Sequence, residues 1–315
     1  MSKVSGSIRF NTDSSKMEIY NGEQWWEIDA TSPEEQTGGT RGLIQHNCLA
    51  ANAATNVIQF INVTTTGDAA DFGDDSKNIK WCSGAGSHTR AIWSGSYNPG
   101  TTDNIRFSTY ASQGDTIDFG DMSYTAIFNS SASDSTRVVM FGGSQSPARV
   151  NTMEYITITH LGNSVDFGDT MNVTATMCGC SSPTRGFFVH GNPNNRDYIE
   201  VLTIASKGNS IKFRNRLFNG GYTMGNCNGV RALFGGGYNQ SPVNSPTTVR
   251  SQIGKITMSS FGRETKFGDL AVARYHSWGL TSKTRACFLG GYSSTFAGVD
   301  SVFYESAGEA INFGE

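Results

Sequence analysis

The segment Gly114-Asp-Thr-Ile-Asp-Phe-Gly-Asp121 returns later in the chain as Gly162-Asn-Ser-Val-Asp-Phe-Gly-Asp169. Its phenylalanine recurs along the 315 residues at intervals of 46 to 54 residues. The six members of the series are Phe72, Phe119, Phe167, Phe213, Phe267 and Phe313. Self-similarity at a nearly fixed period is typical of repeat architectures. The chain is therefore predicted to contain six copies of one structural unit.

An arginine marks the same units. Five of the six arginines follow a repeat phenylalanine by 18 residues, whereas the distance forward to the next phenylalanine varies from 28 to 36. The series consists of Arg41, Arg90, Arg137, Arg185, Arg231 and Arg285. One half of each unit is thus predicted to be rigid, and the other half to carry a loop of adjustable length.

Each unit carries signals for four strands. A glycine five positions before every repeat phenylalanine, such as Gly114, is usually followed by Asp or Asn, which suits a tight hairpin turn. Apolar residues on both sides of the turn predict the two hairpin strands, and alternation puts the phenylalanine and the residue two positions before it on one inward face. A short apolar run after the arginine and the segment before it supply two more strands.

Four strands in about 47 residues, without a helix signal, are typical of the blade of a β-propeller. We predict an all-β chain in which residues 40–315 form a six-bladed Kelch-like β-propeller, with a β-solenoid as the alternative. The chain enters the repeat at the arginine strand and leaves it at the phenylalanine strand. This order predicts that the two ends of the chain pair within one shared sheet and so close a ring.

Residues 1–29 lie outside the repeat. Strands are expected at residues 7–10, 16–20 and 24–28, with Asn21-Gly22 as a hairpin turn, so this segment is predicted to be a small β-meander. Residues 30–39 are polar and are predicted to be a linker. So small a sheet cannot bury Trp25 and Trp26 by itself. We expect an anchor or oligomerisation module that packs on a partner chain, on the propeller or on copies of itself.

Composition excludes several classes of protein. Twenty-four Lys and Arg against 27 Asp and Glu give a net charge of −3, which argues against nucleic acid as a partner. No apolar stretch approaches the ~18 residues of a membrane helix, and no apolar leader is present, so membrane insertion is not expected. The six cysteines lack CxxC spacing and are expected to be free thiols, with a disulfide or a metal site as the alternatives.

Two stretches carry a family resemblance. The strings Gly162–Asp169 and Ser182-Pro-Thr-Arg-Gly-Phe-Phe188 resemble the tandem Kelch-like repeats of tailed-phage virion proteins, especially those of cyanobacterial phages, and this likeness covers residues 40–315. The string Gly6-Ser-Ile-Arg-Phe-Asn-Thr-Asp13, with Tyr20-Asn-Gly22 and the Trp25-Trp26 pair, is similar to a short module of phage tail-fibre and collar proteins. The first and fourth units depart from the pattern, at Gln45 and at Arg214.

The resemblance implies a non-enzymatic structural protein of the virion, made in the host cytoplasm and placed on a tail, fibre or capsid vertex. The resemblance implies that residues 1–39 bind other virion proteins and that the chain forms a homo-oligomer. It implies no cofactor. Contact with a glycan on the host surface is left open. A carbohydrate-binding receptor module is the alternative function. A glycan-cleaving enzyme in the propeller channel is a weaker alternative, because the sequence lacks the Ser-x-Asp-x-Gly-x-Thr-Trp box of sialidases.

Three tyrosines are candidates for glycan or receptor contact. Each stands seven residues after a repeat arginine, in a variable loop: Tyr97, Tyr238 and Tyr292. A tyrosine ring stacks well on a sugar while its hydroxyl forms hydrogen bonds. Ordinary packing within the loops is the alternative reading.

An aspartate follows most repeat phenylalanines by two positions: Asp74, Asp121, Asp169 and Asp269. We expect structural pairs between these aspartates and the repeat arginines, with calcium binding as an alternative. The arginines could instead line a channel and bind an anionic sugar.

The five histidines show no metal-binding spacing, so no metal site is expected.

Overall fold

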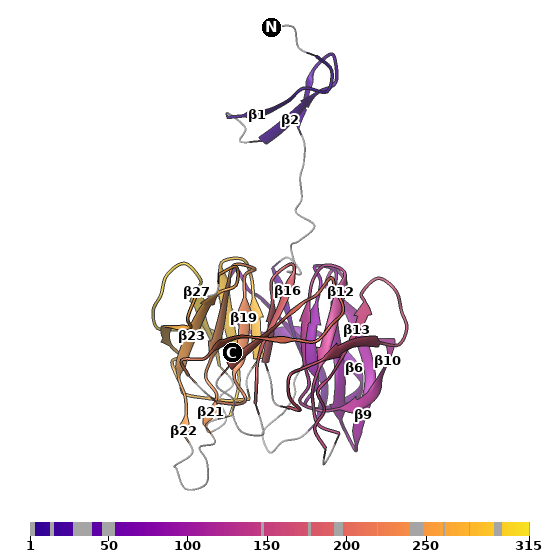
Figure 1. Cartoon of the computed structure of the whole chain (residues 1–315), viewed down its shortest axis with the longest axis vertical. Helices are drawn as coiled ribbons and strands as arrows, with labels where there is room; N and C mark the ends of the chain where they lie inside the picture. The colour runs from indigo at the N-terminus through magenta and orange to yellow at the C-terminus, as the bar shows by residue number, and fades with distance from the viewer. Residues whose placement is uncertain are drawn as a thin grey trace. The chain divides into compact units, whose positions relative to one another are not determined.

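The computed structural model describes residues 4–12, 16–27, 40–45, 54–145, 148–175, 178–191, 198–218, 220–239, 248–260, 262–276, 278–292 and 298–314. The chain divides into two compact units, Met1–Glu34 and Glu35–Glu315. The division falls within the predicted linker 30–39, which lies outside the described residues. Each unit is considered by itself below (Figure 1).

The smaller unit is the predicted meander. Its strands β1 (Ile8–Asn11), β2 (Lys16–Tyr20) and β3 (Trp25–Glu27) form one antiparallel sheet in the order β1-β2-β3. The turn between β2 and β3 begins at Asn21, whose side-chain Oδ1 accepts hydrogen bonds from the backbone N–H groups of Glu23 and Gln24. Gly22 supplies the positive φ, 109°, that such a turn requires.

The described strands of the larger unit form six small antiparallel sheets and one two-stranded ribbon. The sheets follow one another along the chain. The first three contain β4 (Arg41–Gln45), β5 (Thr55–Asn62) and β6 (Ala70–Ile79); β7 (Ser83–Gly86), β8 (Arg90–Tyr97), β9 (Thr101–Thr109) and β10 (Ile117–Ala126); and β11 (Ser130–Ser133), β12 (Arg137–Phe141), β13 (Thr152–Thr157) and β14 (Val165–Asp169).

The remaining sheets repeat the same four-stranded plan. They contain β15 (Cys178–Ser181), β16 (Arg185–Val189), β17 (Tyr198–Thr203) and β18 (Ile211–Asn215); β19 (Met224–Cys227), β20 (Arg231–Gly235), β23 (Gln252–Thr257) and β24 (Thr265–Asp269); and β25 (Trp278–Thr281), β26 (Arg285–Leu289), β27 (Val299–Phe303) and β28 (Ile311–Gly314). The ribbon pairs β21 (Tyr238–Asn239) with β22 (Thr248–Val249). No described residue belongs to a helix, and hence none to a helix that could span a membrane.

Each repeat phenylalanine is the extra residue of a β-bulge. In the second sheet, Asp118 pairs with Arg106 and Gly120 pairs with Ile105, which leaves Phe119 without a partner on the opposite strand. The same interruption occurs at the other five phenylalanines. The predicted sharing of one inward face is wrong, because Phe119 is buried whereas Ile117 is 55% exposed. A bulge breaks the alternation on which that expectation relied.

Backbone hydrogen bonds join consecutive sheets. The hairpin glycine of one sheet donates its N–H to the carbonyl of the bulged phenylalanine in the preceding sheet, as Gly114 does to Phe72 at 3.0 Å. Corresponding bonds join Gly162 to Phe119, Gly208 to Phe167 and Gly308 to Phe267. A fifth bond of this kind runs from Gly67 in the first sheet to Phe313 in the last, at 3.2 Å.

Among the described residues, the strand that begins at Arg41 and the last strand of the chain do not share a sheet, so the predicted pairing is wrong for these two strands. Strand β28 pairs with β27 and completes the last sheet by itself, and the described first sheet consists of β4, β5 and β6. The last strand pairs with β27 because the two form a hairpin. The turn at Gly308 is short, so β27 is the nearest strand to which the backbone of β28 can form hydrogen bonds.

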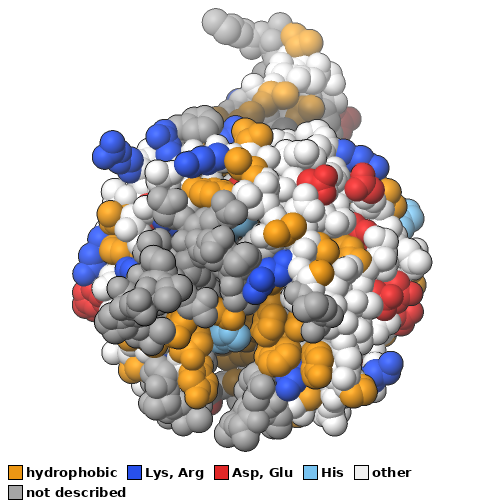
Figure 2. Space-filling view, turned by 60° about the horizontal axis from the view of Figure 1, so that its bottom comes forward, with side chains coloured by type: hydrophobic (Ala, Val, Ile, Leu, Met, Phe, Trp, Pro, Cys, Tyr) orange, Lys and Arg blue, Asp and Glu red, His pale blue; other side chains and the backbone are white. Residues whose placement is uncertain are grey.

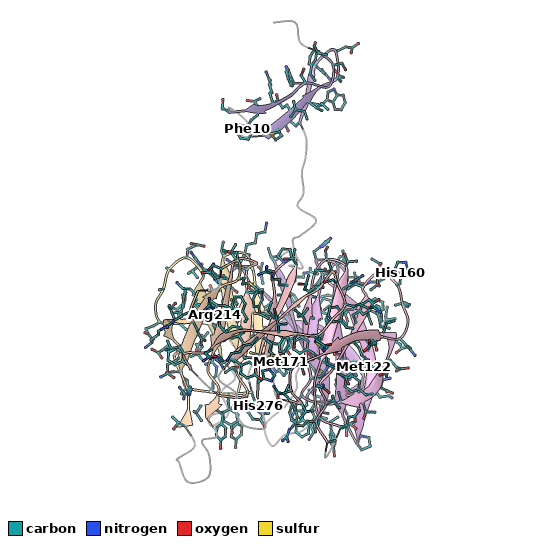
Figure 3. The ribbon with its side chains drawn as sticks, viewed as in Figure 1. Phe10, Met122, His160, Met171, Arg214 and His276 are labelled. Carbon is teal, nitrogen blue, oxygen red and sulfur yellow. The ribbon has the colours of Figure 1, made fainter. Side chains whose placement is uncertain are left out.

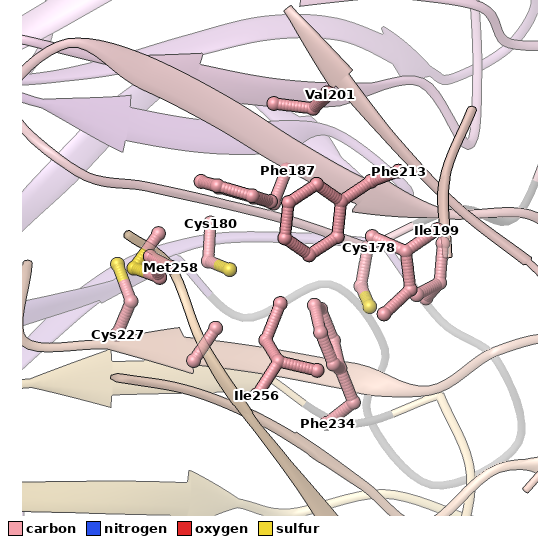
Figure 4. Packing of buried hydrophobic residues seen from close by; sticks show 12 residues of the cluster. Cys178, Cys180, Phe187, Ile199, Val201, Phe213, Cys227, Phe234, Ile256 and Met258 are labelled. Atoms are coloured by element: carbon pink, nitrogen blue, oxygen red, sulfur yellow. The ribbon is translucent and has the colours of Figure 1, made fainter. Parts of the chain in front are cut away.

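Apolar side chains fill the spaces between neighbouring sheets. Figure 4 shows one such cluster, in which Phe187 of β16 and Phe213 of β18 face Phe234 of β20 and Ile256 of β23. A corresponding cluster joins Ile61 of the first sheet to Phe313 and other residues of the last. The five described cysteines are buried and no disulfide joins any two of them, and Cys48 lies outside the described residues.

Candidate functional site

The first strands of the four-stranded sheets lie side by side: β7 beside β11, β11 beside β15, β15 beside β19 and β19 beside β25. We call these five the inner strands. They surround a cavity of about 120 Å³, which we call the inner-strand cavity. The lining is polar along the strands, with Ser83, Ser131 and Thr223, and aromatic where the chain enters them.

The aromatic part of the lining comes from one position of the repeat. Trp81, Phe128, Tyr222 and His276 each stand nine residues after a repeat phenylalanine, and all four line the cavity. All four have left-handed backbones, with φ of 63°, 57°, 56° and 56°. We call them the aromatic cluster. The corresponding residue of the third unit, Thr176, lies outside the described residues.

The left-handed conformation is unusual for such large residues. It costs a non-glycine residue roughly 1–2 kcal/mol relative to the right-handed form. Backbone hydrogen bonds hold the strained positions in place, since the N–H of Phe128 donates to the carbonyl of Trp81 and the N–H of His276 donates to that of Tyr222, both at 3.2 Å. Strain of this kind, observed at several equivalent positions, suggests a functional demand on the side chains.

The rings of the aromatic cluster contact one another across the cavity. Trp81 and Phe128 have centroids 4.7 Å apart, and Tyr222 stacks on His276 at 3.9 Å. Phe128 also lies 5.7 Å from His276 and 6.4 Å from Tyr222, so it joins the two pairs. All four side chains remain partly exposed and therefore offer ring surface to solvent.

The three predicted tyrosines lie next to this cluster. Tyr97 pairs with Lys80 and its ring lies 5.3 Å from Trp81. Tyr238 and Tyr292 both contact Tyr275, with centroid distances of 5.0 Å and 5.4 Å. Tyr275 in turn lies 6.1 Å from Tyr222. The structure thus brings the predicted tyrosines to one end of the cavity, where we call Tyr97, Tyr238, Tyr275 and Tyr292 the rim tyrosines.

The figures show where this end of the unit lies. Figure 3 labels His276 toward the lower end of the larger unit. Figure 2 turns that end toward the viewer and shows hydrophobic side chains gathered beside one histidine. Tyr292 is 60% exposed. The aromatic surface is therefore reachable from solvent.

The described lining of the cavity carries no Asp, Glu, Lys or Arg. Burial lowers the pKa of His276 to about 4, so its imidazole is neutral near pH 7. Burial and the neighbouring tyrosines raise the pKa of Tyr275, and burial raises the pKa of the Cys178 thiol to about 11. Lys80 is a nearby cation, with its Nζ 4.4 Å from the ring of Trp81. The described lining is accordingly uncharged near pH 7, and the ammonium group of Lys80 lies at its edge.

Hydrogen-bonding groups lie deeper in the cavity. The hydroxyls of Ser83 and Ser131 are 2.8 Å apart, and the Oγ1 of Thr223 lies 3.2 Å from the thiol of Cys178. Asn129 donates from Nδ2 to Ser94, while its buried Oδ1 has no hydrogen-bond partner among the described residues.

The repeat arginines are structural and do not line the cavity. Each of five guanidinium groups donates from Nη1 to a backbone carbonyl of the following sheet, as Arg90 does to Ile158 at 2.6 Å. The others reach Tyr110, Ile204, Tyr304 and, for Arg285 of the last sheet, Val63 of the first. The expected pairs with repeat aspartates are therefore wrong for these five, as is a channel of arginines. Arg90 and Tyr97 are the first and last residues of β8, so the arginines lie at the opposite end of the sheets from the rim tyrosines.

The repeat aspartates serve the junctions between sheets. The backbone N–H of Asp74 donates to the side-chain oxygen of Asp115 in the next hairpin turn, and Asp121 and Asp169 donate likewise to Asn163 and Asn209. The Asp269 carboxylate pairs with Lys266. Within the part of the chain that the structure describes, no three His, Cys, Asp or Glu side chains are grouped to hold a metal ion.

Sequence reasoning missed the aromatic cluster and Tyr275. The sequence does contain a signal for the aromatic cluster, because aligning the units on their phenylalanines places Trp81, Phe128, Tyr222 and His276 in one column. The four residues are of four different types, so the column does not stand out as a conserved pattern of the repeat. Backbone conformation, rather than residue identity, is the property that the four positions share.

No protein-family model matches the sequence, and no curated protein matches it. In contrast, 349 chains of solved structures match the fold. One of them, described as "Structure of YjhT", superposes with a TM-score of 0.67 over 86% of this chain and 97% of that chain, at 8% sequence identity. The fold is β-propeller-like. At so low an identity, the likeness carries no information on function.

Proposed function

We propose that this chain is a non-enzymatic structural protein of a tailed-phage virion, in which residues 40–315 form a closed six-bladed Kelch-like β-propeller and residues 1–29 join the chain to its assembly. The two sequence resemblances support the setting. The pattern of contacts between sheets supports the ring, because both the glycine–phenylalanine bonds and the arginine–carbonyl bonds link the last sheet to the first.

The anchoring role is inferred from the small sheet, which has one apolar, exposed face and one polar face. In the register, Ile8 lies opposite Ile19 and Ile19 opposite Trp26, while Phe10 lies opposite Met17. These five side chains share one face and are 38–59% exposed. Exposed apolar surface in a unit too small for its own core is typical of an interaction site.

Polar side chains on the other face of the small sheet bind one another. The Arg9 Nε donates to Glu18 at 2.7 Å, and its guanidinium lies 4.2 Å from the ring of Trp25. Asn11 donates to the second oxygen of Glu18, and these bonds lower the pKa of that carboxyl. The apolar face is therefore the face that assembles, with copies of the same module or with other virion proteins.

The test is a charge placed in the apolar face. Trp26→Arg and Phe10→Arg in the full chain should reduce oligomers to monomers and prevent incorporation into particles, as measured by light scattering and by mass spectrometry of purified virions. Glu23→Gln, an exposed turn position, is the matched control and should assemble normally. Absence of the unmodified chain from purified particles would overturn the virion role, and assembly of both arginine variants would overturn the anchoring face.

A second candidate function, a carbohydrate-binding receptor module, is favoured by the convergence of Tyr238 and Tyr292 on Tyr275. Glycoside hydrolysis ordinarily uses two carboxylates, and the described cavity lining contains none. A glycan array of host polysaccharides tests the receptor function. Binding that Tyr238→Ala weakens supports it, and failure of the folded chain to bind any host polysaccharide argues against it.

A further inference from the structure

The aromatic cluster is a set of side chains that the backbone does not favour. At a φ near 60° glycine is the residue that costs least. The same fold does use glycine at such angles elsewhere, since Gly95, Gly142, Gly236 and Gly290 have φ of 60°, 61°, 62° and 52° at one position of the repeat. A Cβ at Gly95 or Gly236 would collide with a backbone carbonyl oxygen. Close approach therefore accounts for these two glycines.

The aromatic positions present the opposite case. Their backbones are left-handed to the same degree, yet they carry Trp81, Phe128, Tyr222 and His276. These rings line a cavity and keep part of their surface exposed. Strain at equivalent positions whose side chains line a cavity is typical of a functional demand on those side chains.

We propose that the aromatic cluster and the inner-strand cavity form a binding site for one uncharged pyranose ring at the end of a glycan, with the rim tyrosines holding the next sugars of the chain. The inference rests on the receptor function proposed above and specifies the class of its ligand. A pyranose combines an apolar face of C–H groups with a belt of hydroxyls, and the site combines exposed ring faces with Ser, Thr and Asn side chains.

The absence of charge in the described lining determines the class of sugar. A carboxylate or sulfate brought into this cavity would lose its hydration without gaining a cationic partner from those residues, which is strongly unfavourable. Lys80 does not change this, because its ammonium group lies against the rings of Trp81 and Tyr97 at the edge. Neutral hexoses are therefore favoured over uronic or sialic acids.

The dimensions determine how much of the ligand enters. The cavity of about 120 Å³ is smaller than the ~300 Å³ at which ligand pockets usually begin, so it suits one ring and not an oligosaccharide. The hydroxyls of Ser83, Ser131 and Thr223, three residues of the lining, can bind the hydroxyls of that ring. The rim tyrosines continue the aromatic surface outward from Trp81 on one side and from Tyr222 on the other.

The experiment measures binding of neutral and acidic hexamers to the full chain by calorimetry. The neutral probes are maltohexaose, cellohexaose, mannohexaose and chitohexaose, and the acidic probe is hexagalacturonate. At least one neutral probe should bind with an affinity that changes less than twofold between low and high salt, and hexagalacturonate should not bind. A phenylalanine-rich peptide is included, because aromatic surfaces also bind peptides.

Variants locate the site. Trp81→Gly and Phe128→Gly keep the left-handed backbone and should weaken binding at least tenfold, and exposed Tyr292→Ala should weaken it several-fold. Trp93→Phe changes a buried tryptophan that does not line the cavity and should leave affinity unchanged. His276→Tyr copies the residue of the preceding unit and should retain binding. Thermal unfolding confirms that each variant is folded.

Several results would overturn the inference. These are a folded chain that binds no neutral hexamer, binding of hexagalacturonate or the peptide alone, or unchanged affinity in both glycine variants. The same variants are scored for incorporation into particles. Failure of the folded, unmodified chain to bind any neutral hexamer, together with normal incorporation into particles, overturns this inference and leaves the virion role intact, whereas a chain that binds a neutral hexamer but is absent from particles overturns only the virion role.

Discussion

The backbone carbonyl of Phe313 accepts a hydrogen bond from the N–H of Gly67, although 246 positions separate the two residues in the sequence. Phe313 is 3% exposed and packs with Ile61 and Val63 of the first sheet and with Leu289 of its own. Strand β28 thus supplies both a hydrogen bond and an apolar side chain to the junction between the last sheet and the first.

Loss of this side chain should destabilise the larger unit. Phe313→Ala is expected to lower the free energy of unfolding by about 3–5 kcal/mol, because it leaves a cavity at the junction. Phe119→Ala, at the equivalent position of the second sheet, should cost a similar amount. Urea unfolding of both variants checks this. If Phe313→Ala were nearly neutral while Phe119→Ala were costly, the junction would contribute little and the closed ring would lose its support.

Two glycines of one junction should respond differently to alanine. A Cβ on Gly268 would overlap the carbonyl oxygen of Gly308, whereas a Cβ on Gly308 would meet nothing within 4 Å. Neither residue has a positive φ. Gly268→Ala should therefore cost about 1–3 kcal/mol through forced separation of the sheets, and Gly308→Ala should stay within about 0.5 kcal/mol of the unmodified chain. Equal unfolding midpoints for the two variants would contradict the observed approach.

A buried and an exposed ion pair should contribute differently to the free energy of unfolding. Arg274 and Asp300 form a pair 2.8 Å long with side chains 0% and 2% exposed, while the Glu305 partner of Arg231 is 76% exposed. Asp300→Ala would remove the carboxylate that offsets the buried positive charge of Arg274, and about 3–5 kcal/mol of the free energy of unfolding should be lost. Glu305→Ala should cost less than about 1 kcal/mol. Thermal or urea unfolding of the two variants compares them directly.

His276 should make stability depend on pH. Its pKa of about 4 in the folded chain lies below the unfolded value near 6.5, so the unfolded state binds the proton more readily between these limits. Stability should therefore fall as pH is lowered from about 6.5 to about 4, by up to about 3 kcal/mol. His276→Tyr lacks this group. The free energy of unfolding of the unmodified chain should therefore fall relative to that of His276→Tyr as the pH is lowered from about 6.5 to about 4. A difference that is constant with pH would contradict the prediction.

The left-handed backbone of Trp81 should reverse the usual order of glycine and alanine. Glycine adopts a φ of 63° at little cost and alanine does not, so Trp81→Gly should be more stable than Trp81→Ala by about 1 kcal/mol. Trp93 lies in the regular strand β8, where glycine costs more than alanine, so Trp93→Gly should be the less stable of its pair. Urea midpoints of the four variants show whether the signs are opposite.

Part of the candidate site could be predicted from the sequence. Tyr97, Tyr238 and Tyr292 follow the repeat arginines by seven residues, and equal spacing in equal units puts them at equivalent places in space. The aromatic cluster could not be predicted in the same way. Its members do not share one residue type, and a left-handed φ at a tryptophan or phenylalanine is not expected from local propensity.

The sequence alone determined the repeat, the strands of each unit and the hairpin turns, because these depend on residues that are near one another in the chain. Tertiary structure decided the partners that lie a whole unit or more away. Arg90 binds the carbonyl of Ile158 instead of a repeat aspartate, and β28 completes its own sheet instead of the first. Every residue has a carbonyl, so no pattern in the side chains marks which one an arginine will reach, and only the packing of neighbouring sheets selects it.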